Sequence, residues 1–398
     1  MNAINPKICV RSKTLGELVT IKGGGTPSRD VEAYWNGPIP WASVKDFKGK
    51  EISQTAESIS DLGLENSASN LIPAGTILVP TRMAVGKAAI NTVDLAINQD
   101  LKALFPNEAV NVRYLLHALL ASSGDLERRA TGATVKGITL EVLRELPIRL
   151  PPLPEQKRIA AILDQADALR AKRREALAKL DEMAQAIFVE MFGDPADNPH
   201  GWNKVSLGTL ISDGPQNGLY KPSSDYGDGT PILRIDSFYD GVVTKLDRLK
   251  RLRISSVEQK LYALHADDIV VNRVNSMEYL GKSALIPALP EPMVFESNMM
   301  RFTLDREQAD PRFIIQHFQL PFIKNQIKTA AKHAVNQSSI NQTDVTRFQV
   351  ICPPLPMQKD FSRYLANIDK QKAMVRKSQA GLESLFTSLQ HRAFSGDL

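Results

Sequence analysis

The sequence carries a duplicated motif whose two copies lie about half the chain apart. Pro151–Lys157 (PPLPEQK) returns as Pro353–Lys359 (PPLPMQK), with six of seven positions identical. Phe192–Asp194 is echoed in the same way by Phe394–Asp397, at the end of the 398-residue chain. A repeat of roughly 200 residues is far longer than the units of solenoid proteins. The sequence therefore predicts one globular module followed by one helix, used twice.

The first copy of the motif opens a long helical segment. Pro154 suits the first turn of a helix, where its missing N–H is not needed, and no Gly or Pro follows until Gly193. From Glu155 to Phe192, residues recur at alternating steps of four and three, as in a coiled-coil seam with one polar member. At about 1.5 Å per residue this helix would be roughly 57 Å long. The predicted seam consists of Ile162, Ala166, Leu169, Arg173, Ala176, Leu180, Met183 and Ile187.

The second copy of the motif predicts a matching helix. An antiparallel pair needs no long return connection, so we expect the two helices to pair with each other as an antiparallel coiled coil. One consistent register places Ile162 opposite Leu389 and Arg173 opposite Ser378. The alternative is that each helix packs on its own globular module. The second seam consists of Tyr364, Ile368, Gln371, Val375, Ser378, Leu382, Leu385 and Leu389.

The segments outside the helices predict mixed structure. Short β-like runs such as Thr76–Val79 and Ile269–Val271 alternate with turn-rich stretches. The stretches Val112–Ala121 and Arg312–Thr329, which precede the two Pro-rich motifs, are typical of helices. We therefore predict the α+β class, with two tandem mixed α/β domains joined by two long antiparallel helices. The expected boundaries are 1–150 and 201–352 for the domains, and 151–200 and 353–398 for the helical spacers.

Composition excludes several classes of protein. Lys and Arg total 49 against 44 Asp and Glu, and a net charge of +5 permits a polyanionic partner only if the positive charge is clustered. Cys9 and Cys352 are the only cysteines, which excludes a disulfide scaffold and favours a reducing cytoplasm. No apolar stretch approaches the roughly 18 residues of a membrane-spanning helix, so no membrane association is expected. Met1–Lys13 lacks the pattern of a secretory signal.

The motifs that would mark an enzyme are missing. Gly23–Thr26 lacks the Lys that ends a phosphate-binding loop. The six His and two Cys offer no metal-ligand spacing. Asn198–His200 lacks the second proline and the aromatic residue with which adenine methyltransferases hold a flipped base. We therefore expect a non-catalytic chain with no metal or cofactor of its own. A self-contained enzyme and a coiled-coil scaffold without a DNA function remain alternatives.

Polar loops in both modules have the composition of a DNA-binding surface. Gly214–Ser224 supplies Gln, Asn, Tyr and Lys side chains, and His333–Asn341 supplies several amides. The basic run from Lys245 to Arg253 is by itself more often a solvated face. Phosphates bind cations, whereas base edges are recognised by bidentate donors and acceptors. Loops that combine Lys and Arg with amides and hydroxyls therefore favour double-stranded DNA as the partner.

Several motifs together resemble a known family. They cover almost the whole chain, and they resemble the target-recognition domains of the specificity subunit of type I restriction-modification systems. In the second module, Gly214–Tyr220 replaces the Gly-Gly-Thr opening and Ser297–Met299 replaces the Asn-Gln-Asp stretch, as expected if the modules read different sequences. The motifs are Gly24–Ser28, Tyr34-Trp35, Ile39–Trp41, Ile97–Leu101, Gly132–Ile138 and Leu146–Lys157 with its helix.

The resemblance implies a division of labour. Each module would read one half of a bipartite DNA target, and the helices would set the half-site spacing. The helices would also dock two methyltransferase subunits and, where the system has them, two restriction subunits. S-adenosylmethionine, ATP and Mg would then be bound by those partners. The residues expected to contact DNA are Lys22, Thr26, Ser28, Arg29, Lys45, Arg82 and Lys136 in the first module, and Gln216, Lys221, Arg234, Arg273, Asn275, Lys282 and Asn336 in the second.

Overall fold

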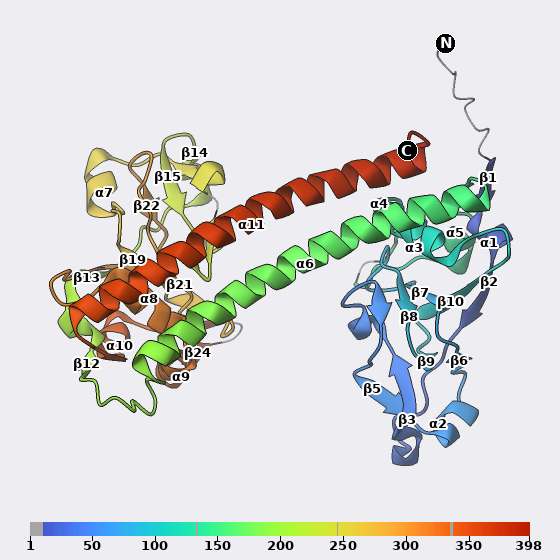
Figure 1. Cartoon of the computed structure of the whole chain (residues 1–398), viewed down its shortest axis with the longest axis horizontal. Coiled ribbons are helices and arrows are strands. Elements are labelled where there is room, and N and C mark those ends of the chain that lie inside the picture. Colours follow the sequence, from blue (N-terminus) through green and yellow to red (C-terminus); the bar gives the residue numbers. More distant parts are fainter. Residues whose placement is uncertain (1–10, 133, 245, 335–336) are drawn as a thin grey trace, which may run out of the picture. The chain divides into compact units, whose positions relative to one another are not determined.

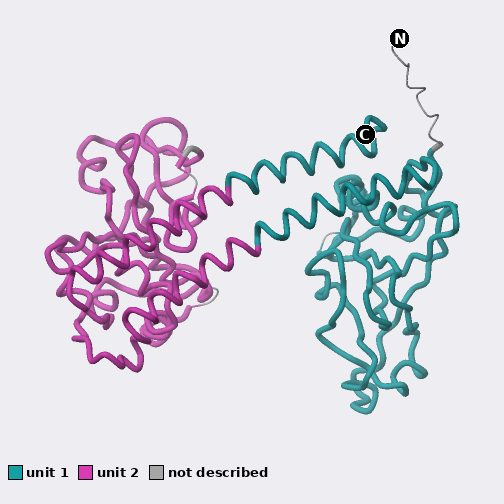
Figure 2. Tube along the Cα trace, viewed as in Figure 1, with its two compact units in different colours: residues 1–174, 377–398 teal, residues 175–376 magenta. Residues whose placement is uncertain are grey.

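The computed structural model describes residues 11–132, 134–244, 246–334 and 337–398. Within it the chain forms two compact units (Figure 2): unit 1 combines Met1–Arg174 with Lys377–Leu398, and unit 2 is Glu175–Arg376. Three of the residues singled out from the sequence, Cys9, Lys245 and Asn336, lie outside the described ranges. Both long helices contribute to both units, because the boundary between the units falls inside each helix.

Unit 1 contains two principal sheets and a small sheet that joins the start of the chain to the motif (Figure 1). Its short helices are α1 (Leu15–Leu18), α2 (Asp61–Glu65), α3 (Val112–Ala121), α4 (Ser123–Arg129) and α5 (Leu140–Arg144). The five-stranded sheet has the order β2 (Val19–Gly23), β10 (Leu101–Pro106), β7 (Ile77–Pro80), β8 (Ala89–Asn91), β4 (Glu51–Ile52). The four-stranded sheet has the order β5 (Glu57–Ile59), β3 (Trp35–Ala42), β9 (Leu95–Ile97), β6 (Leu71–Ile72), and β1 (Arg11–Thr14) pairs with β11 (Pro147–Leu150).

The core of unit 1 follows from the alternation of side chains along its central strand. Ile77 and Val79 of β7 face the cluster that includes α3, whereas Leu78 faces the opposite cluster with Leu95 and Ile97 of the second sheet. Successive side chains of a strand point to opposite faces. A strand that is covered on both faces must therefore read as a continuous apolar run, as β7 does.

Unit 2 repeats this plan with more strands. Its helices are α7 (Ser256–Leu261), α8 (Pro311–Gln319), α9 (Pro321–Ala330) and α10 (Gln342–Arg347). The six-stranded sheet has the order β13 (Ile211–Asn217), β23 (Met299–Leu304), β19 (Ile269–Asn272), β21 (Ser283–Leu285), β17 (Gly241–Val243), β16 (Phe238–Tyr239). The smaller sheets are β14 (Tyr226–Gly227), β18 (Arg251–Leu252), β15 (Thr230–Leu233), β22 (Val294–Phe295); β20 (Val274–Asn275), β25 (Gln337–Ser339), β24 (Lys332–Ala334); and β12 (Lys204–Ser206), β26 (Gln349–Ile351).

One predicted helix of unit 2 is two helices. The expected helix over Arg312–Thr329 ends at Gln319 as α8, and α9 begins at Pro321. Leu320 between them has an extended backbone, with φ −81° and ψ 151°. A residue that precedes proline disfavours the helical region, because the proline ring collides with its backbone. The prediction of one uninterrupted helix was therefore wrong at the residue before Pro321.

The long helices are α6 (Leu153–Phe192, 40 residues) and α11 (Leu355–Ser395, 41 residues), and they pair with each other. In unit 1, Arg170 of α6 forms an ion pair with Glu383 of α11. In unit 2, Asp181 of α6 lies 2.5 Å from Lys372 of α11. Residue numbers rise along one helix as they fall along the other, which confirms the antiparallel pairing. Each helix also packs on a globular module, so the two alternatives weighed from the sequence are both present.

Only part of the predicted seam is buried in the structure, and several of its residues face solvent. Ala166, Leu180, Ile187, Ile368, Val375, Leu382 and Leu389 are at least partly buried, and Ile162 is half-buried. Leu169, Met183, Tyr364 and Leu385 are instead exposed by 43% or more. The buried stripe uses the residue after each of them, including Arg170 and Phe386. Arg170 can occupy a seam position because its guanidinium is paired and its aliphatic stem can be buried.

The duplicated motif has a structural role at the start of each long helix. The fully buried Gln156 accepts a hydrogen bond from the Asn111 amide at 2.8 Å and donates to the Pro151 carbonyl at 2.8 Å. Gln358 forms the equivalent bonds, from the Asp310 amide at 3.0 Å and to the Pro353 carbonyl at 2.7 Å. Asn111 and Asp310 are the N-cap residues of α3 and α8. Each glutamine therefore ties a long helix to the helix that precedes the motif.

In the described ranges, every helix is too short or too polar to span a bilayer. Charged residues recur throughout the two long helices.

Candidate nucleic-acid interface

In unit 1 two cationic loops that lie far apart in the sequence are joined by backbone hydrogen bonds. The Met83 amide donates to the Lys136 carbonyl at 3.0 Å, and the Ile138 amide donates to the Thr81 carbonyl at 2.9 Å. This antiparallel bridge places Arg82 opposite Gly137. The Arg82 side chain is 59% exposed, with Asp100 at 3.8 Å, and Lys136 is exposed. We call segment 81–84, together with the described residues 131–132 and 134–138, loop pair 1.

Unit 2 joins the corresponding segments as a small sheet. β20, which contains Asn275, pairs with β25, and the Ile340 amide donates to the Arg273 carbonyl at 2.9 Å. The Arg273 guanidinium donates to the Ser297 carbonyl at 3.1 Å. We call segments 273–279 and 332–340 loop pair 2. It carries exposed Lys332 and His333 on β24, which the sequence reasoning did not select. Asn336 belongs to this segment but lies outside the described residues.

In a second cationic surface of unit 1, the side chain of Arg29 lies over a tryptophan ring. The Arg29 guanidinium lies 3.6 Å from the centre of the Trp35 ring and bonds Glu57 at 2.6 and 3.1 Å. The hydrogen bond with Glu57 raises the pKa of Arg29 and lowers that of Glu57. The Trp35 indole N–H donates to the Ser28 carbonyl at 3.0 Å, and the Thr26 hydroxyl donates to the Gln99 side chain. These contacts hold the Thr26–Arg29 loop in one conformation.

Lys22 and Lys45 are exposed cations on other parts of unit 1. The Lys22 ammonium lies 5.3 Å from the Phe105 ring centre, on the neighbouring strand. Lys45 lies in a short 3-10 helix (Val44–Asp46) whose N-cap is Ser43. Both side chains extend into solvent from regular elements, where a phosphate could be contacted without unfolding a loop.

The predicted residues of unit 2 are more engaged with their own module. Gln216 donates to the Leu261 carbonyl at 3.0 Å and accepts from Arg301 at 2.8 Å. Lys221 lies 2.7 Å from Glu258, and this hydrogen bond is the main cause that lowers the pKa of Glu258 to about 2.

Arg234 and Lys282 of unit 2 are also engaged. Arg234 lies 3.4 Å from Glu296, whose pKa is raised by burial. The Lys282 ammonium donates to the Ile235 carbonyl at 2.5 Å and lies 3.9 Å from the Tyr239 ring centre. Any contact of these side chains with DNA has to compete with partners they already have.

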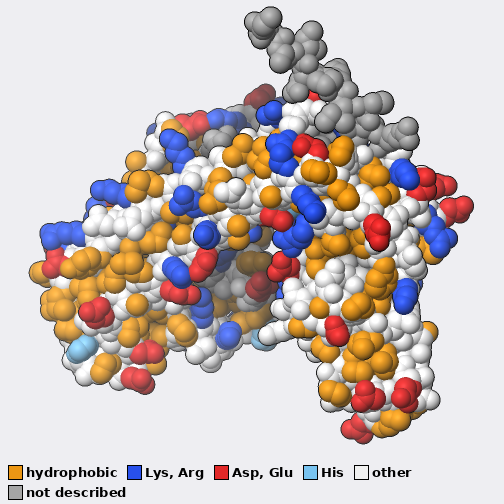
Figure 3. Space-filling model, turned by 45° about the vertical axis from the view of Figure 1, so that its right-hand side comes forward, with side chains coloured by type: hydrophobic (Ala, Val, Ile, Leu, Met, Phe, Trp, Pro, Cys, Tyr) orange, Lys and Arg blue, Asp and Glu red, His pale blue; other side chains and the backbone are white. Residues whose placement is uncertain are grey.

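Net charge does not mark the interface by itself. On the face shown in Figure 3, Lys and Arg side chains are interspersed with Asp, Glu and apolar side chains. The most exposed apolar side chains at or near the predicted loops are Met83 (61% exposed), in loop pair 1, and Tyr220 (78% exposed), beside Lys221; Val135 and Tyr279 in the loop pairs are less exposed. Met83 has a φ of +63°. Sequence pattern could not select either residue, because exposure depends on the loop conformation.

Metal ligands do not cluster in the described part of the chain. Among these residues no group of three or more His, Cys, Asp or Glu is arranged to hold a metal ion. The arrangement as a whole offers cations, amides and an aromatic-backed guanidinium on loops held by a rigid core, which suits recognition of a polyanion with base-specific edges.

Comparison with known proteins gives a family match to both halves of the chain. The profile described as "Type I restriction modification DNA specificity domain" matches residues 10–179 and again 199–384. The EcoR124I/EcoR124II specificity subunit of Escherichia coli is 36% identical over 183 residues, which cover 44% of this chain and 45% of the relative. The MjaIX specificity subunit of Methanocaldococcus jannaschii is 24% identical over 375 residues, which cover 88% of this chain and 84% of the relative.

The fold also resembles solved structures. A type I restriction-modification S subunit from M. genitalium aligns over 99% of this chain and 98% of its own length, with a TM-score of 0.57 and 16% identity. A chain from a study of type I complex assembly and conformational transition aligns over the full length of both chains, with a TM-score of 0.54 and 17% identity. At these identities the likeness concerns the fold.

Proposed function

The chain belongs to the family of DNA specificity subunits of type I restriction-modification systems, and on that premise we propose how its surfaces divide the work of recognition. It is a non-catalytic subunit that recognises a bipartite DNA target within the type I complex. The observation that carries the proposal is the double match of the family profile, together with a loop pair of the same construction in each unit.

Each module reads one half-site. The domains extend over 1–150 and 201–352, and the spacers over 151–200 and 353–398. Loop pairs 1 and 2 contact the duplex, with Arg82 and Lys136 in one and Arg273, Asn275 and Asn336 in the other. Lys22, Lys45, Arg29, Ser28 and Thr26 add contacts in module 1, and Gln216, Lys221, Arg234 and Lys282 add contacts in module 2. Guanidinium and amide groups are the side chains that read guanine and adenine edges, whereas lysines contact phosphates.

The paired helices set the half-site separation and dock two methyltransferase subunits, with two restriction subunits in systems that cleave. Those partners bind S-adenosylmethionine, ATP and Mg. A cytoplasmic location follows from this assembly on genomic DNA. The antiparallel ion pairs of α6 and α11 in both units support a stiff spacer, because paired long helices resist bending more than single ones do.

The test is a map of adenine methylation in the host genome with and without this gene. Loss of one two-part motif with a fixed gap on deletion is the expected result. An unchanged methylome in a strain that expresses the methyltransferase subunits would overturn the proposal. Re-expression of the gene with Arg82 and Lys136 both changed to Ala should restore less methylation at that motif than the wild-type gene does.

A further inference from the structure

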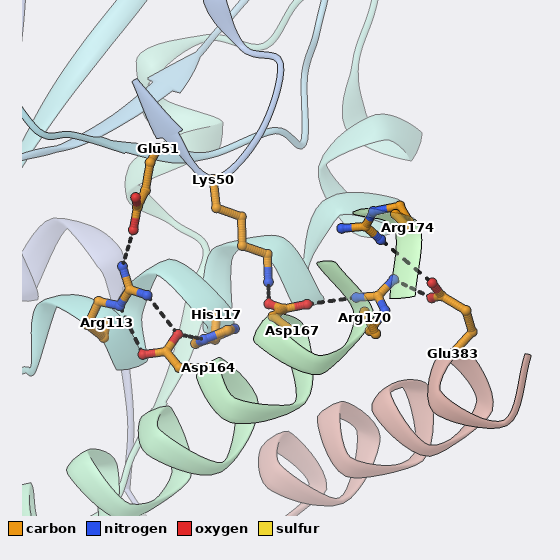
Figure 4. Close-up of polar contacts among 9 residues, drawn as sticks. All are labelled: Lys50, Glu51, Arg113, His117, Asp164, Asp167, Arg170, Arg174 and Glu383. Carbon is orange, nitrogen blue, oxygen red and sulfur yellow. Dashed lines mark hydrogen bonds and ion pairs between the residues drawn. The ribbon is translucent and has the colours of Figure 1, made fainter. Parts of the chain in front are cut away.

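The two units attach their main sheet to the long helices by different chemistry. In unit 1, Lys50 extends from the sheet edge to α6 and forms an ion pair with Asp167 (Figure 4). Asp167 also accepts from Arg170 at 2.7 Å, and Arg170 pairs with Glu383 of α11. The Lys50 ammonium and the Arg170 guanidinium both lie over the Phe386 ring of α11, at 5.0 and 4.4 Å from its centre. One chain of contacts thus runs from the sheet through α6 to α11.

The neighbouring residue makes a second attachment in unit 1. Glu51, on β4, lies 3.1 Å from Arg113 of α3. Arg113 bonds Asp164 of α6 at 2.9 and 3.0 Å, and Asp164 lies 2.7 Å from the buried His117. Hydrogen bonds from Arg113 and His117 lower the pKa of Asp164 against the opposing effect of its burial.

Strand register identifies the counterparts of these two residues in unit 2. Glu51 on β4 is opposite Ile90 of β8, and Val242 on β17 is opposite Leu285 of β21, in parallel pairs that occupy the same place in their sheets. Lys50 therefore corresponds to Gly241, and Glu51 to Val242. Gly241 has a φ of +80°, a conformation that favours glycine over residues with side chains.

The helix partners are retained in unit 2, although the sheet's side chains are not. Lys372 pairs with Asp181 across the helices, as Arg170 does with Glu383, and Arg312 of α8 lies 2.5 Å from Asp369 of α11. Where Lys50 fills the space in unit 1, unit 2 has a pocket of about 450 Å³ lined by Gly241, Val242, Asp369 and Lys372 among others. The sheet edge of unit 2 therefore lacks an ionic attachment at this place among the described residues.

We propose that Lys50 is a positioning residue for gap selectivity: by fixing the sheet of module 1 on the paired helices, it restricts the complex to one distance between half-sites. The proposal rests on the proposed function of the chain. Each added base pair moves a half-site by about 3.4 Å along the duplex and turns it around the axis. A module held by two ionic attachments resists this displacement more than a module that can rock on an open pocket.

The charges that face Lys50 define when the attachment holds. They come from α6 (Asp164, Asp167, Arg170 and Arg174), from α3 (Arg113 and His117) and from α11 (Glu383). Burial first, and then the neighbouring Arg170, lower the pKa of Lys50 to about 8. The attachment is therefore charged at pH 7 and loses its cation as the pH rises above about 8.

The experiment measures methylation of duplexes that carry the mapped target with its natural gap, or with one base pair more or fewer. It uses the complete complex with its methyltransferase subunits. Lys50→Met keeps the aliphatic stem and removes the charge, and should raise the ratio of altered-gap to natural-gap methylation about tenfold, a factor equivalent to about 1.4 kcal/mol. Lys50→Arg should restore the wild-type ratio. Lys48→Met, which removes the same charge from an exposed site two residues away, should leave the ratio unchanged.

The outcomes separate this inference from the proposed function. An equal loss of methylation at every gap in the Lys50→Met complex, or an unchanged ratio, would overturn the positioning role while the proposed function stands. A wild-type complex that methylates no bipartite duplex would overturn the proposed function instead. Raising the pH from 7 to about 9 should increase the wild-type ratio, whereas the Lys50→Arg ratio should stay constant, because arginine keeps its proton in this range.

Discussion

Each unit keeps an ion pair between the two long helices, but the side chains that dominate the rest of the junction differ. In unit 1 the junction is ionic: Lys50, Arg113 and Arg170 meet Asp164, Asp167 and Glu383. In unit 2 it is aromatic, with Phe188 of α6 stacked 5.6 Å from Phe313 of α8 and edge-on to Phe361 of α11 at 5.4 Å. His317 lies 5.1 Å from the Phe188 ring. Duplication has kept the ion pairs made by the helices but not the side chains that the sheet edge contributes.

This comparison shows that the repeat preserves the side chains that form hydrogen bonds with backbone groups at the helix starts. Gln156 and Gln358 occupy equivalent positions, and each satisfies backbone groups at the start of its long helix. The space between the sheet edge and the helices is filled by Lys50 in unit 1 and is a pocket in unit 2, so this contact can change while the polar groups on the helices keep their partners.

The largest expected effect comes from the aromatic junction. Phe188 is fully buried, and Phe188→Ala should lower the free energy of unfolding of unit 2 by about 3–5 kcal/mol, because a cavity replaces a packed ring. Hydrogen exchange measured by mass spectrometry should report faster exchange in α8 and the adjacent β23. Peptides from β7 and β10 of unit 1 serve as the internal control. Equal acceleration in both units would contradict a junction that acts locally.

Acid should produce the next largest effect in unit 2. Burial lowers the pKa of His317 to about 4, below its ordinary value of 6.5. The unfolded chain therefore binds this proton first as the pH falls, and unit 2 should lose about 3 kcal/mol between about pH 6.5 and 4. His317→Gln removes the titrating group, and its unfolding free energy should depend less on pH in this window. Urea unfolding followed by hydrogen exchange at several pH values gives the measurement. An identical slope for both proteins would count against the assignment.

The two glutamines should behave alike where the junctions differ. Gln156→Glu and Gln358→Glu each replace an amide that donates to a proline carbonyl with a carboxylate that cannot. Each change should cost about 1–3 kcal/mol of stability, the usual cost of leaving buried polar groups without partners. Thermal unfolding of each variant supplies the test. A large loss for one variant and none for the other would show that the motif has different roles in the two units.

The ion pairs around Asp164 should respond to salt, whereas the packing around Phe188 should not. Asp164→Asn should cost only about 1 kcal/mol, because the Asp164 side chain is 30% exposed and solvent screens its pairs. The cost should shrink further at high salt. The Phe188→Ala cost measured in the same titration is the matched reference. A salt-independent cost for Asp164→Asn would indicate that packing, rather than charge, holds this junction together.

The smallest expected effect is on DNA binding, where the predicted contact residues differ in how strongly they already pair with acidic side chains. Arg82→Ala in loop pair 1 should weaken binding to all duplexes and reduce the slope of log affinity against log salt by about 0.9, as for one lost phosphate contact. Lys221→Ala should change the slope less, because Lys221 already pairs with Glu258. Filter binding at several salt concentrations gives both slopes. A larger change for Lys221→Ala would reverse the ranking.

The positions of the long helices were the most predictable part of the fold. Which of their residues are buried was the least predictable. The Gly- and Pro-free stretch predicted α6 to within two residues, and the uninterrupted runs around Ile77 and Ile269 predicted β7 and β19. A step of four and three fits two neighbouring columns of residues on a helix. Hydropathy selects Leu169 over Arg170, but only the tertiary structure supplies the partners that allow Arg170 to be buried.

The candidate interface was predictable in composition but not in arrangement. Sequence reasoning selected Arg82 and Lys136 as separate cations, and the structure joins their loops by a backbone bridge. It also selected Lys221 and Arg234, whose acidic partners lie 37 and 62 residues further along the chain. The roles of these residues toward DNA stay predictions. Pairing between distant segments leaves no periodic signal, because each contact depends on the path of the whole chain between them.

The sequence by itself determined the duplication, the two long helices, their antiparallel sense and the family of the protein, because these follow from local pattern and from motifs that repeat. Only the tertiary structure decided which side chains share a junction. Lys50 meets Asp167 because a sheet edge and a helix more than a hundred residues apart are packed together. Its counterpart Gly241 leaves a pocket where the strand takes a left-handed turn. Local pattern fixes the elements, whereas the space left between packed elements decides which residues act on one another.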